Sequence, residues 1–350
     1  MKGIHTSELF AIKHAVFLFL FGADSPGPVN ALPFWLNKSV LIAGSGGLIG
    51  AALLRALSGR CARLQGWRRA DGDLREPQAA RAMLALGPFD VVFVLAATQG
   101  GLADHLARPL AYVRDNAAIA LNCIGAAADA GIARLVFAAS SALYPDDGEG
   151  PFSESQLAIG RIDPAHRPYA GAKLLGMRLC EAAASELGLC YVPAILGNIY
   201  GPGGSFDPQR ATFVHALIAR ALAARQNGES LLDVWGSGRA RRDVLHAEDA
   251  AAALMAIAQA GDPRPINVAS GLNPSVAEIA ALIAKQAGLE GVRFDASKPE
   301  GALSRAMDIS RLRALGFAPN VALEDGIART FAYYAQALGC NEPGTMSGNT

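Results

Sequence analysis

The sequence has little charge, no net charge and no apolar segment long enough to span a bilayer. Only 18% of the 350 residues are charged, and 31 Lys and Arg balance 31 Asp and Glu. No global field therefore favours nucleic acid or an anionic membrane, and an anionic ligand needs a local site. The 51% of hydrophobic residues exclude a disordered chain and predict one large domain or two modest ones.

Cysteine is also scarce, and its spacing excludes the common metal motifs. The five cysteines are odd in number, widely scattered and without a C-x-x-C pair: Cys61, Cys123, Cys180, Cys190 and Cys340. We expect reduced thiols, no metal site and a cytoplasmic protein.

The N-terminus contains a nine-residue apolar run, "AVFLFLFGA" at 15–23, which follows Lys2 and Lys13. It is too short to span a bilayer but resembles the charged and apolar regions of a signal peptide. We expect residues 1–37 to be an extension outside the fold, with export or membrane-surface anchoring left open.

Apolar runs typical of strands alternate with helix-like segments from residue 38 onward. The expected strands are 38–43, 90–97, 134–140, 190–197 and 231–236, and the longest helices are 108–131 and 169–187. Because parallel strands need crossover connections, this pattern predicts an α/β fold with a Rossmann-like, doubly wound parallel sheet.

The character of the chain changes after residue 203, where loops such as "GPGGSFDPQ" separate shorter helices at 211–226, 247–260 and 275–287. We expect a smaller C-terminal α/β substrate-binding lobe over 204–338, with returns of the chain to the sheet. The last residues, 339–350, are expected to be a frayed tail.

Three glycines, Gly44, Gly47 and Gly50, lie where the first strand passes into a helix. Glycine is needed there because the backbone turns tightly and approaches a pyrophosphate, which the amides at the helix N-terminus bind. The strand before and the helix after make this a strong prediction of a dinucleotide site.

The choice of cofactor depends on the residues after the next strand, where an acidic side chain binds the 2′-hydroxyl of NAD. Here Arg68 and Arg69 come before any acid. Guanidinium groups suit a 2′-phosphate, so NADP(H) is favoured, with NAD as the alternative. We expect the adenine, ribose or pyrophosphate to contact a further set of residues: Asp73, Leu74, Ala96, Ala97 and Asn116.

The stretch "PYAGAK" places Tyr169 and Lys173 four residues apart, on one face of a helix. A nearby ammonium stabilises a phenolate and makes the phenol a usable acid or base at neutral pH. Ser140 ends an earlier strand, in "SSALYP". Together with the glycine loop, these three residues indicate an acid-base catalytic site beside the dinucleotide, where we expect Tyr169 and Lys173 also to contact the cofactor.

The glycine loop and these three residues resemble the extended short-chain dehydrogenase/reductase family, the NAD(P)-dependent nucleotide-sugar epimerases, dehydratases and reductases. The resemblance covers about 38–335, and within the family it is strongest to the GDP-fucose synthase branch. The most specific stretches are "VWGSGRARRDVLHAEDAAAA", "INVASG" and "FDASKPEG".

The resemblance implies roles for individual residues. Ser140 would hold the sugar O4, Tyr169 would donate its proton, and Lys173 would tune Tyr169 and bind the nicotinamide ribose. The implied substrate-binding residues are Asn198, beside the cofactor, and three cations for the nucleotide diphosphate: Arg220, Arg242 and Lys298. Opposing cations suit a buried pyrophosphate.

Two positions depart from that branch. Ala142 stands where the fucose synthases carry a cysteine, and Thr212 stands at the matching histidine, so the pair that exchanges protons at C3 and C5 is absent. His215 lies one helical turn on and is kept as a candidate replacement. The dehydratases carry an Asp-Glu pair where this chain has Ser141 and Ala142, which argues against dehydration.

The sequence therefore predicts an NADPH-dependent 4-reductase of a nucleotide-activated 4-keto-6-deoxyhexose. An NAD-retaining 4-epimerase, a full epimerase-reductase using His215 and a non-enzymatic dinucleotide sensor remain as alternatives. In similar proteins the equivalents of helices 108–131 and 169–187 pair in a dimer, so we expect a homodimer; core packing is the other explanation of their apolar faces.

Overall fold

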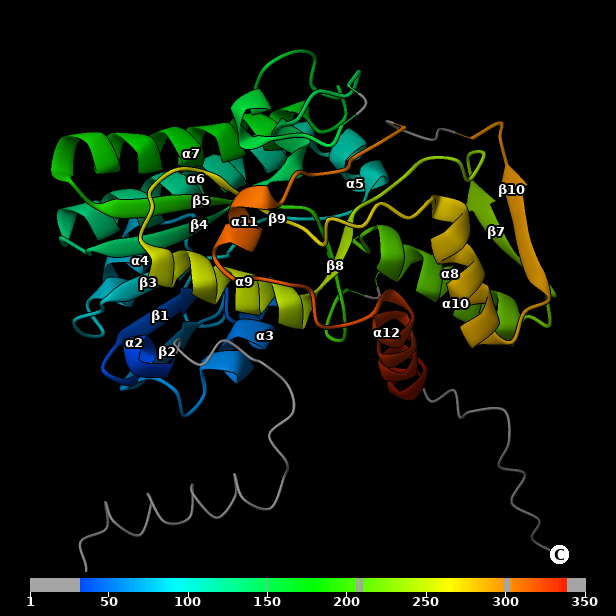
Figure 1. Cartoon of the computed structure of the whole chain (residues 1–350), viewed down its shortest axis with the longest axis horizontal. Coiled ribbons are helices and arrows are strands. Elements are labelled where there is room, and N and C mark those ends of the chain that lie inside the picture. Colours follow the sequence, from blue (N-terminus) through cyan, green and yellow to red (C-terminus); the bar gives the residue numbers. More distant parts are fainter. Residues whose placement is uncertain (1–31, 149, 206, 208–209, 299–302, 339–350) are drawn as a thin grey trace, which may run out of the picture.

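A parallel six-stranded sheet forms the centre of the larger part of the molecule, in the order β2-β1-β3-β4-β5-β9 (Figure 1). The computed structural model describes residues 32–338 except 149, 206, 208–209 and 299–302. The strands are β1 (Ser39–Ala43), β2 (Arg63–Trp67), β3 (Val91–Val94), β4 (Arg134–Ser140), β5 (Cys190–Leu196) and β9 (Ile266–Val268).

Helices cover both faces of this sheet. Helices α4 (Pro77–Leu84), α6 (Pro109–Asp129) and α7 (Arg167–Leu187) pack together on one face, and α3 (Leu48–Leu57) packs against α9 (Ala247–Ala260) on the other (Figure 1). This arrangement confirms the predicted doubly wound α/β fold.

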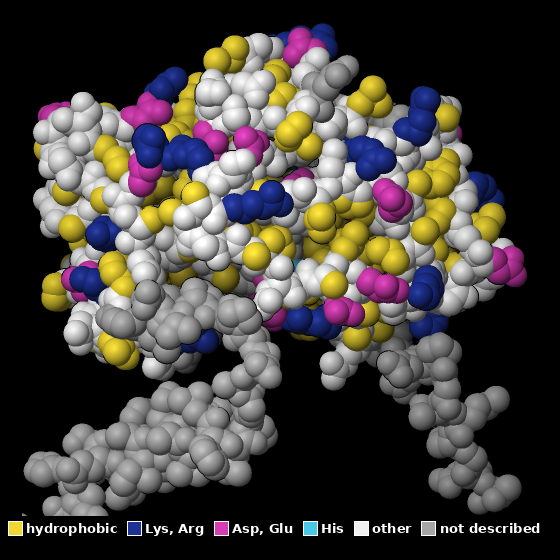
Figure 2. All heavy atoms as spheres, viewed as in Figure 1, with side chains coloured by type: hydrophobic (Ala, Val, Ile, Leu, Met, Phe, Trp, Pro, Cys, Tyr) yellow, Lys and Arg dark blue, Asp and Glu magenta, His cyan; other side chains and the backbone are white. Residues whose placement is uncertain are grey.

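Charged side chains of both signs are interspersed over the face of the molecule shown in Figure 2. This agrees with the zero formal charge of the chain. Within the described part, no helix is both long and apolar enough to cross a membrane.

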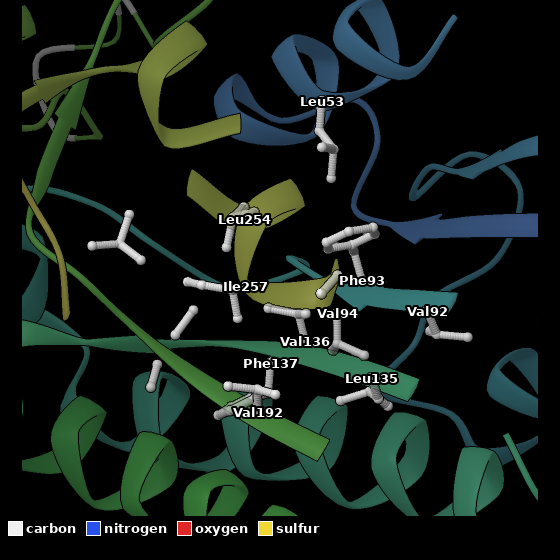
Figure 3. Close-up of a cluster of buried hydrophobic side chains, with 14 of the residues drawn as sticks. Leu53, Val92, Phe93, Val94, Leu135, Val136, Phe137, Val192, Leu254 and Ile257 are labelled. Carbon is white, nitrogen blue, oxygen red and sulfur yellow. The ribbon is translucent and has the colours of Figure 1, made fainter. Parts of the chain in front are cut away.

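The core lies between the sheet and its helices. Figure 3 shows Phe93 and Val136 of the central strands near Leu254 and Ile257 of α9, while Phe137 points to the opposite face of the sheet, toward α7; all five are at most 1% exposed. Because both faces are covered, β3 and β4 read as continuous apolar runs, which is why the sequence located them correctly.

The strand order reverses between β1 and β3, which are neighbours although β2 lies between them in the chain. Ligands of open α/β sheets bind at such a reversal, outside the carboxyl ends of the strands. The glycine loop follows β1 and residues 95–100 follow β3, so the fold brings these two segments together.

A smaller lobe carries its own sheet, in which β7 (Leu231–Trp235) pairs in parallel with β10 (Gly291–Asp295). The predicted strand at 231–236 therefore exists but lies outside the central sheet (Figure 1). Only one face of β7 is buried, whereas the central strands are buried on both. The lobe is completed by three helices: α8 (Phe213–Gln226), α10 (Val276–Ala287) and α12 (Leu323–Ala337).

The chain crosses between the two parts more than once. Strand β6 (Asn198–Tyr200) pairs with β8 (Val244–His246), and then α9 and β9 return to the central sheet before α10 enters the lobe. The remaining elements are short: α2 (Leu32–Leu36), α5 (Leu102–Ala107), α11 (Ser310–Ala314) and the 3₁₀ turns η1 (Ser141–Leu143) and η2 (Glu154–Gln156).

The fold begins earlier than the sequence predicted. Trp35 is 1% exposed and its ring stacks 6.3 Å from that of Phe93, so it belongs to the core. The expected boundary at residue 37 is corrected to about residue 32, because an aromatic side chain outside the apolar run supplies the first core contact. The run at 15–23 and the tail at 339–350 lie outside the described residues.

Candidate active site

The loop after β1 fits closely against the end of β3. Gly44 has φ +94°, and a Cβ placed on it would lie 2.6 Å from the amide nitrogen of Ala96. A Cβ on Gly50 would lie 2.2 Å from the carbonyl oxygen of Gly44. Gly47 directly precedes the first turn of α3, whose free amides face the loop. This cradle has the form that a pyrophosphate needs.

Of the two predicted arginines, Arg68 is the one brought onto the glycine loop. Its side chain packs over Gly46, with Cγ 3.3 Å from where a Cβ would be, and it lines a cavity of about 410 Å³ together with Ser45 and Asp71. Arg69 is 75% exposed and lies 3.5 Å from Asp73.

Asp73 is already paired within the protein. It accepts bonds from the side chain and the backbone amide of Arg75, which lower the Asp73 pKa to about 2. Leu74 is buried in the core, and its carbonyl accepts a bond from Asn122. Both residues therefore help to fix the loop after β2.

Asn116, on α6, clamps the chain just beyond β3. Its side-chain oxygen accepts from the Thr98 amide at 3.1 Å, and its nitrogen donates to the Thr98 carbonyl at 3.0 Å. Ala97 is exposed beside this clamp. The clamp fixes the backbone from which Gln99 projects.

Ser140, Tyr169 and Lys173 come from two adjacent elements, the end of β4 and the first turns of α7. The Ser140 hydroxyl accepts the Ala142 amide at 3.2 Å, which leaves its proton free to be donated. The Lys173 ammonium donates to the Ala138 carbonyl at 2.7 Å and lies 5.6 Å from the centre of the Tyr169 ring. The predicted triad is therefore assembled.

The electrostatics of the triad differ from the sequence expectation. Burial raises the Tyr169 pKa, with a smaller lowering by a hydrogen bond with Ser140, and burial lowers the Lys173 pKa to about 7. The lysine was expected to lower the phenol pKa, but its ammonium is held by a backbone carbonyl. The phenol therefore stays protonated at neutral pH and can act as a proton donor.

Two residues near Tyr169 escaped the sequence analysis. The Tyr169 hydroxyl donates to Oε1 of Gln99 at 3.0 Å. The buried ring of His105 packs edge to face with Tyr169, at 5.3 Å between centres, and burial lowers the His105 pKa to about 4. Gln99 could have been found from its position after the carboxyl end of β3; His105 had no comparable signal.

The residues considered for C3 and C5 chemistry supply no free acid or base. Ala142 lies in η1, and Thr212 bonds to Nδ1 of His215 at 2.9 Å. Nε2 of His215 donates to the Gly201 carbonyl at 3.0 Å, and the side chain is 2% exposed. Both nitrogens of His215 are thus engaged, Nδ1 with Thr212 at the start of α8 and Nε2 with Gly201. No His, Cys, Asp and Glu cluster that could hold a metal occurs among the described residues.

The four expected substrate residues lie toward the smaller lobe. Asn198 donates to the Asp243 carbonyl at 3.0 Å, and Arg242 donates to the Arg241 carbonyl at 2.8 Å. Arg220 lies over the exposed Trp235 ring, 5.5 Å from its centre, while Lys298 is exposed after β10. Arg220 and Lys298 therefore both belong to the β7–β10 side of the lobe.

Comparison with known proteins identifies the class. The NAD dependent epimerase/dehydratase family model matches residues 40–269, and the chain belongs to this family. The match covers the glycine loop, the triad and the return of the chain through β9. The protein is accordingly an NAD(P)-dependent enzyme of the nucleotide-sugar epimerase and reductase group.

Several similar proteins carry names that refer to GDP-linked sugars. The chain is 33% identical over 312 residues to GDP-L-fucose synthase of Escherichia coli, covering 86% of this chain and 97% of that protein. It is 28% identical over 299 residues to GDP-L-colitose synthase of Yersinia pseudotuberculosis, covering 84% and 97%. Among solved structures, an NADP-bound GDP-mannoheptose C4 reductase from Campylobacter jejuni superposes with a TM-score of 0.76 at 25% identity, covering 85% and 98%.

Proposed function

We propose that this protein is an NADPH-dependent reductase that converts the 4-keto group of a nucleotide-activated 4-keto-6-deoxyhexose into a hydroxyl, without proton exchange at C3 or C5. The observation that carries the proposal is the contrast within one site. Ser140, Tyr169 and Lys173 are assembled, whereas Ala142 and Thr212 replace the proton-exchange pair expected from the resemblance.

The chemistry requires one hydride and one proton. When bound, the reduced nicotinamide supplies the hydride to C4 of the sugar. Tyr169 gives its phenolic proton to O4, while the Ser140 hydroxyl donates a hydrogen bond to the same oxygen. The phenolate formed on Tyr169 is then reprotonated from solvent. A phenol that burial keeps protonated suits this direction of reaction.

The cofactor preference is assigned to the surface beside the glycine loop. Gly44 and Gly50 would hold the pyrophosphate, since a side chain at either position would fill the cradle. Arg68 would bind the 2′-phosphate of NADP, because its aliphatic stem packs over Gly46 and its side chain, whose Nε lies 3.6 Å from Asp71, is 66% exposed. Arg69 would add a second, more distant positive charge.

The nucleotide diphosphate would be held by the cations of the smaller lobe. Arg220, Arg242 and Lys298 come from α8, from the segment after β7 and from the turn after β10. Asn198, after β5, would line the sugar between these cations and the triad. The names of the relatives, GDP-L-fucose and GDP-L-colitose synthase, favour a GDP-linked substrate.

The proposed absence of epimerisation rests on the side chains at the two positions where the resemblance implies the proton-exchange pair. An alanine at 142 can neither accept nor donate a proton. His215, the only replacement considered, donates to the Gly201 carbonyl and accepts from Thr212 in the interior of the lobe. These bonds and the 2% exposure favour a structural role for His215 over a role as a proton shuttle.

A homodimer is part of the proposal, formed by α6 and α7. These helices leave several leucines exposed, including Leu110 at 69%, Leu121 at 49% and Leu187 at 53%. Burying them against a second copy would remove apolar surface from water. Light scattering should give twice the chain mass, and a monomer at micromolar concentration would contradict it.

The test is a screen of nucleotide 4-keto-6-deoxy sugars with NADPH and NADH in deuterated water, followed by NMR of the product. We expect NADPH oxidation, a 4-hydroxyl product and no solvent deuterium at C3 or C5. Deuterium there would contradict the loss of epimerisation. Interconversion of 4-epimers with retained cofactor and no NADPH consumption would replace the reductase with a 4-epimerase.

A further inference from the structure

Gln99 contacts the atom from which the reaction takes its proton. The Tyr169 hydroxyl donates to Oε1 of Gln99 at 3.0 Å, and Tyr169 is itself 5% exposed. Gln99 is exposed, so its amide lies at the border between the buried phenol and the space open to a ligand.

The backbone places Gln99 firmly. Asn116 bonds to both the amide and the carbonyl of Thr98, the preceding residue, and also donates to the Tyr112 carbonyl. The start of the segment 95–100 is therefore fixed at two points. It continues directly from β3, and Asn116 of α6 bonds to its backbone. A side chain on such a support is preorganised with respect to Tyr169 on α7.

The phenolate formed by proton transfer has few donors near it. The Lys173 ammonium bonds to the Ala138 carbonyl, and the groups beside the Tyr169 ring are His105, whose ring packs edge to face, and Tyr112, whose hydroxyl donates to Asp104. Ser140 bonds to the phenol oxygen, but the proposed reaction uses its single proton on the sugar O4. A second donor would stabilise the charge that forms there.

An amide can serve both states of the phenol. Its oxygen accepts from the neutral hydroxyl, and rotation of the terminal torsion, which is broad and roughly two-fold, turns its NH₂ group toward the phenolate. We propose that Gln99 is a further catalytic residue: its amide oxygen accepts from the Tyr169 hydroxyl before the keto sugar binds, the hydroxyl proton turns to O4 and is transferred there, and the Gln99 NH₂ group then donates to the phenolate. This inference rests on the proposed reduction at C4.

Two substitutions separate the roles of Gln99. Gln99→Met keeps the length of the side chain and removes both hydrogen-bonding functions. Gln99→Glu keeps an acceptor but, when ionised, has no donor and adds a negative charge beside the phenolate. Gln78→Met, at an exposed position of α4, is the matched control.

We expect Gln99→Met to lower kcat about tenfold, the size of one lost hydrogen bond, with the KM of the keto sugar unchanged within about twofold. The solvent deuterium isotope effect on kcat should increase, because proton transfer becomes slower. Gln99→Glu should lower kcat further, and Gln78→Met should match the wild type. Melting curves of the variants should match the wild type. A folding defect would lower activity without changing the isotope effect, so the two measurements separate a catalytic role of Gln99 from a structural one.

Wild-type kcat in either Gln99 variant would overturn the inference, as would a loss of kcat in Gln99→Met without a larger isotope effect. If the wild type interconverts 4-epimers and reduces no keto sugar, the proposed reduction fails while the same variants test Gln99 in epimerisation, which uses the same proton transfer at O4. Absence of any hydride transfer at C4 would overturn both.

Discussion

The two sides of the candidate site differ in how their polar groups are used. Around the Tyr169 hydroxyl, Ser140 and Gln99 direct polar groups at the reacting oxygen. At the positions expected to act on C3 and C5, Ala142 has no polar side chain and Thr212 is bonded to His215. Under the proposed function, the groups needed for hydride transfer are present, whereas the acid-base pair needed for epimerisation is not.

If the proposed function holds, reduction and epimerisation are structurally separable activities. The triad depends on β4 and α7, whereas Ala142 lies in η1 and Thr212 directly precedes α8. Two side chains can therefore change without disturbing the hydrogen bonds of the triad. Reduction needs one proton donor, and epimerisation needs two more groups placed on either side of the sugar.

The largest effect on kcat is expected at Tyr169, the proposed proton donor. Tyr169→Phe removes the proton donor and should lower kcat about a thousandfold. The dissociation constant of NADPH, measured by fluorescence, should stay within about twofold, because the ring and its packing are retained. A variant with more than a tenth of wild-type turnover would exclude Tyr169 as the proton donor.

Lys173→Met should lower kcat about a hundredfold and yet raise stability. Burial lowers the Lys173 pKa from 10.5 to about 7, so the unfolded chain binds the proton more tightly than the folded protein. Wild-type stability therefore rises with pH between about 7 and 10.5 and is lowest below pH 7.

The melting temperature of Lys173→Met should thus exceed that of the wild type by about 3 °C at pH 6, and the gap should shrink toward pH 10. Scanning calorimetry across this range measures it. A variant less stable than the wild type at pH 6 would show that the bond to the Ala138 carbonyl outweighs the cost of burying the charge.

A smaller and more selective effect is expected beside the glycine loop. Arg68→Ala with Arg69→Ala should weaken NADPH binding about thirtyfold and NADH binding less than threefold, because only NADPH carries the 2′-phosphate. Titration calorimetry with NADPH and with NADH measures the two dissociation constants. Arg264→Ala, at an exposed arginine paired with Asp262, is the control, and equal losses for NADPH and NADH would remove the NADP assignment.

The smallest effect on turnover is expected at His215. His215→Asn removes the ring that stacks 5.8 Å from Tyr334 and bonds to Gly201, so the melting temperature should fall by about 4 °C. The kcat for reduction should stay within about twofold. A large loss of turnover at unchanged stability would restore His215 as a catalytic candidate. It would also contradict the proposal that the acid-base groups for epimerisation are absent.

Local sequence signals located much of this molecule. The central strands were found because a strand covered on both faces must be apolar throughout, and the long helices because of their composition and spacing. The glycine loop was equally clear, since Gly44 and Gly50 tolerate no side chain. Local signals did not reveal that β7 leaves the central sheet or that Trp35 joins the core, because both depend on partners far along the chain.

The sequence by itself determined the dinucleotide fold and placed Tyr169 and Lys173 on one helix face, because both depend on residue types at short, regular spacings. Only the tertiary structure decided how these groups are used. It put Gln99 on the Tyr169 hydroxyl from 70 residues away and bound Lys173 to the carbonyl of Ala138. It also enclosed His215 within the smaller lobe. The physical reason is that a proton's affinity for a side chain depends on burial and on hydrogen-bond partners, and folding supplies both from distant parts of the chain.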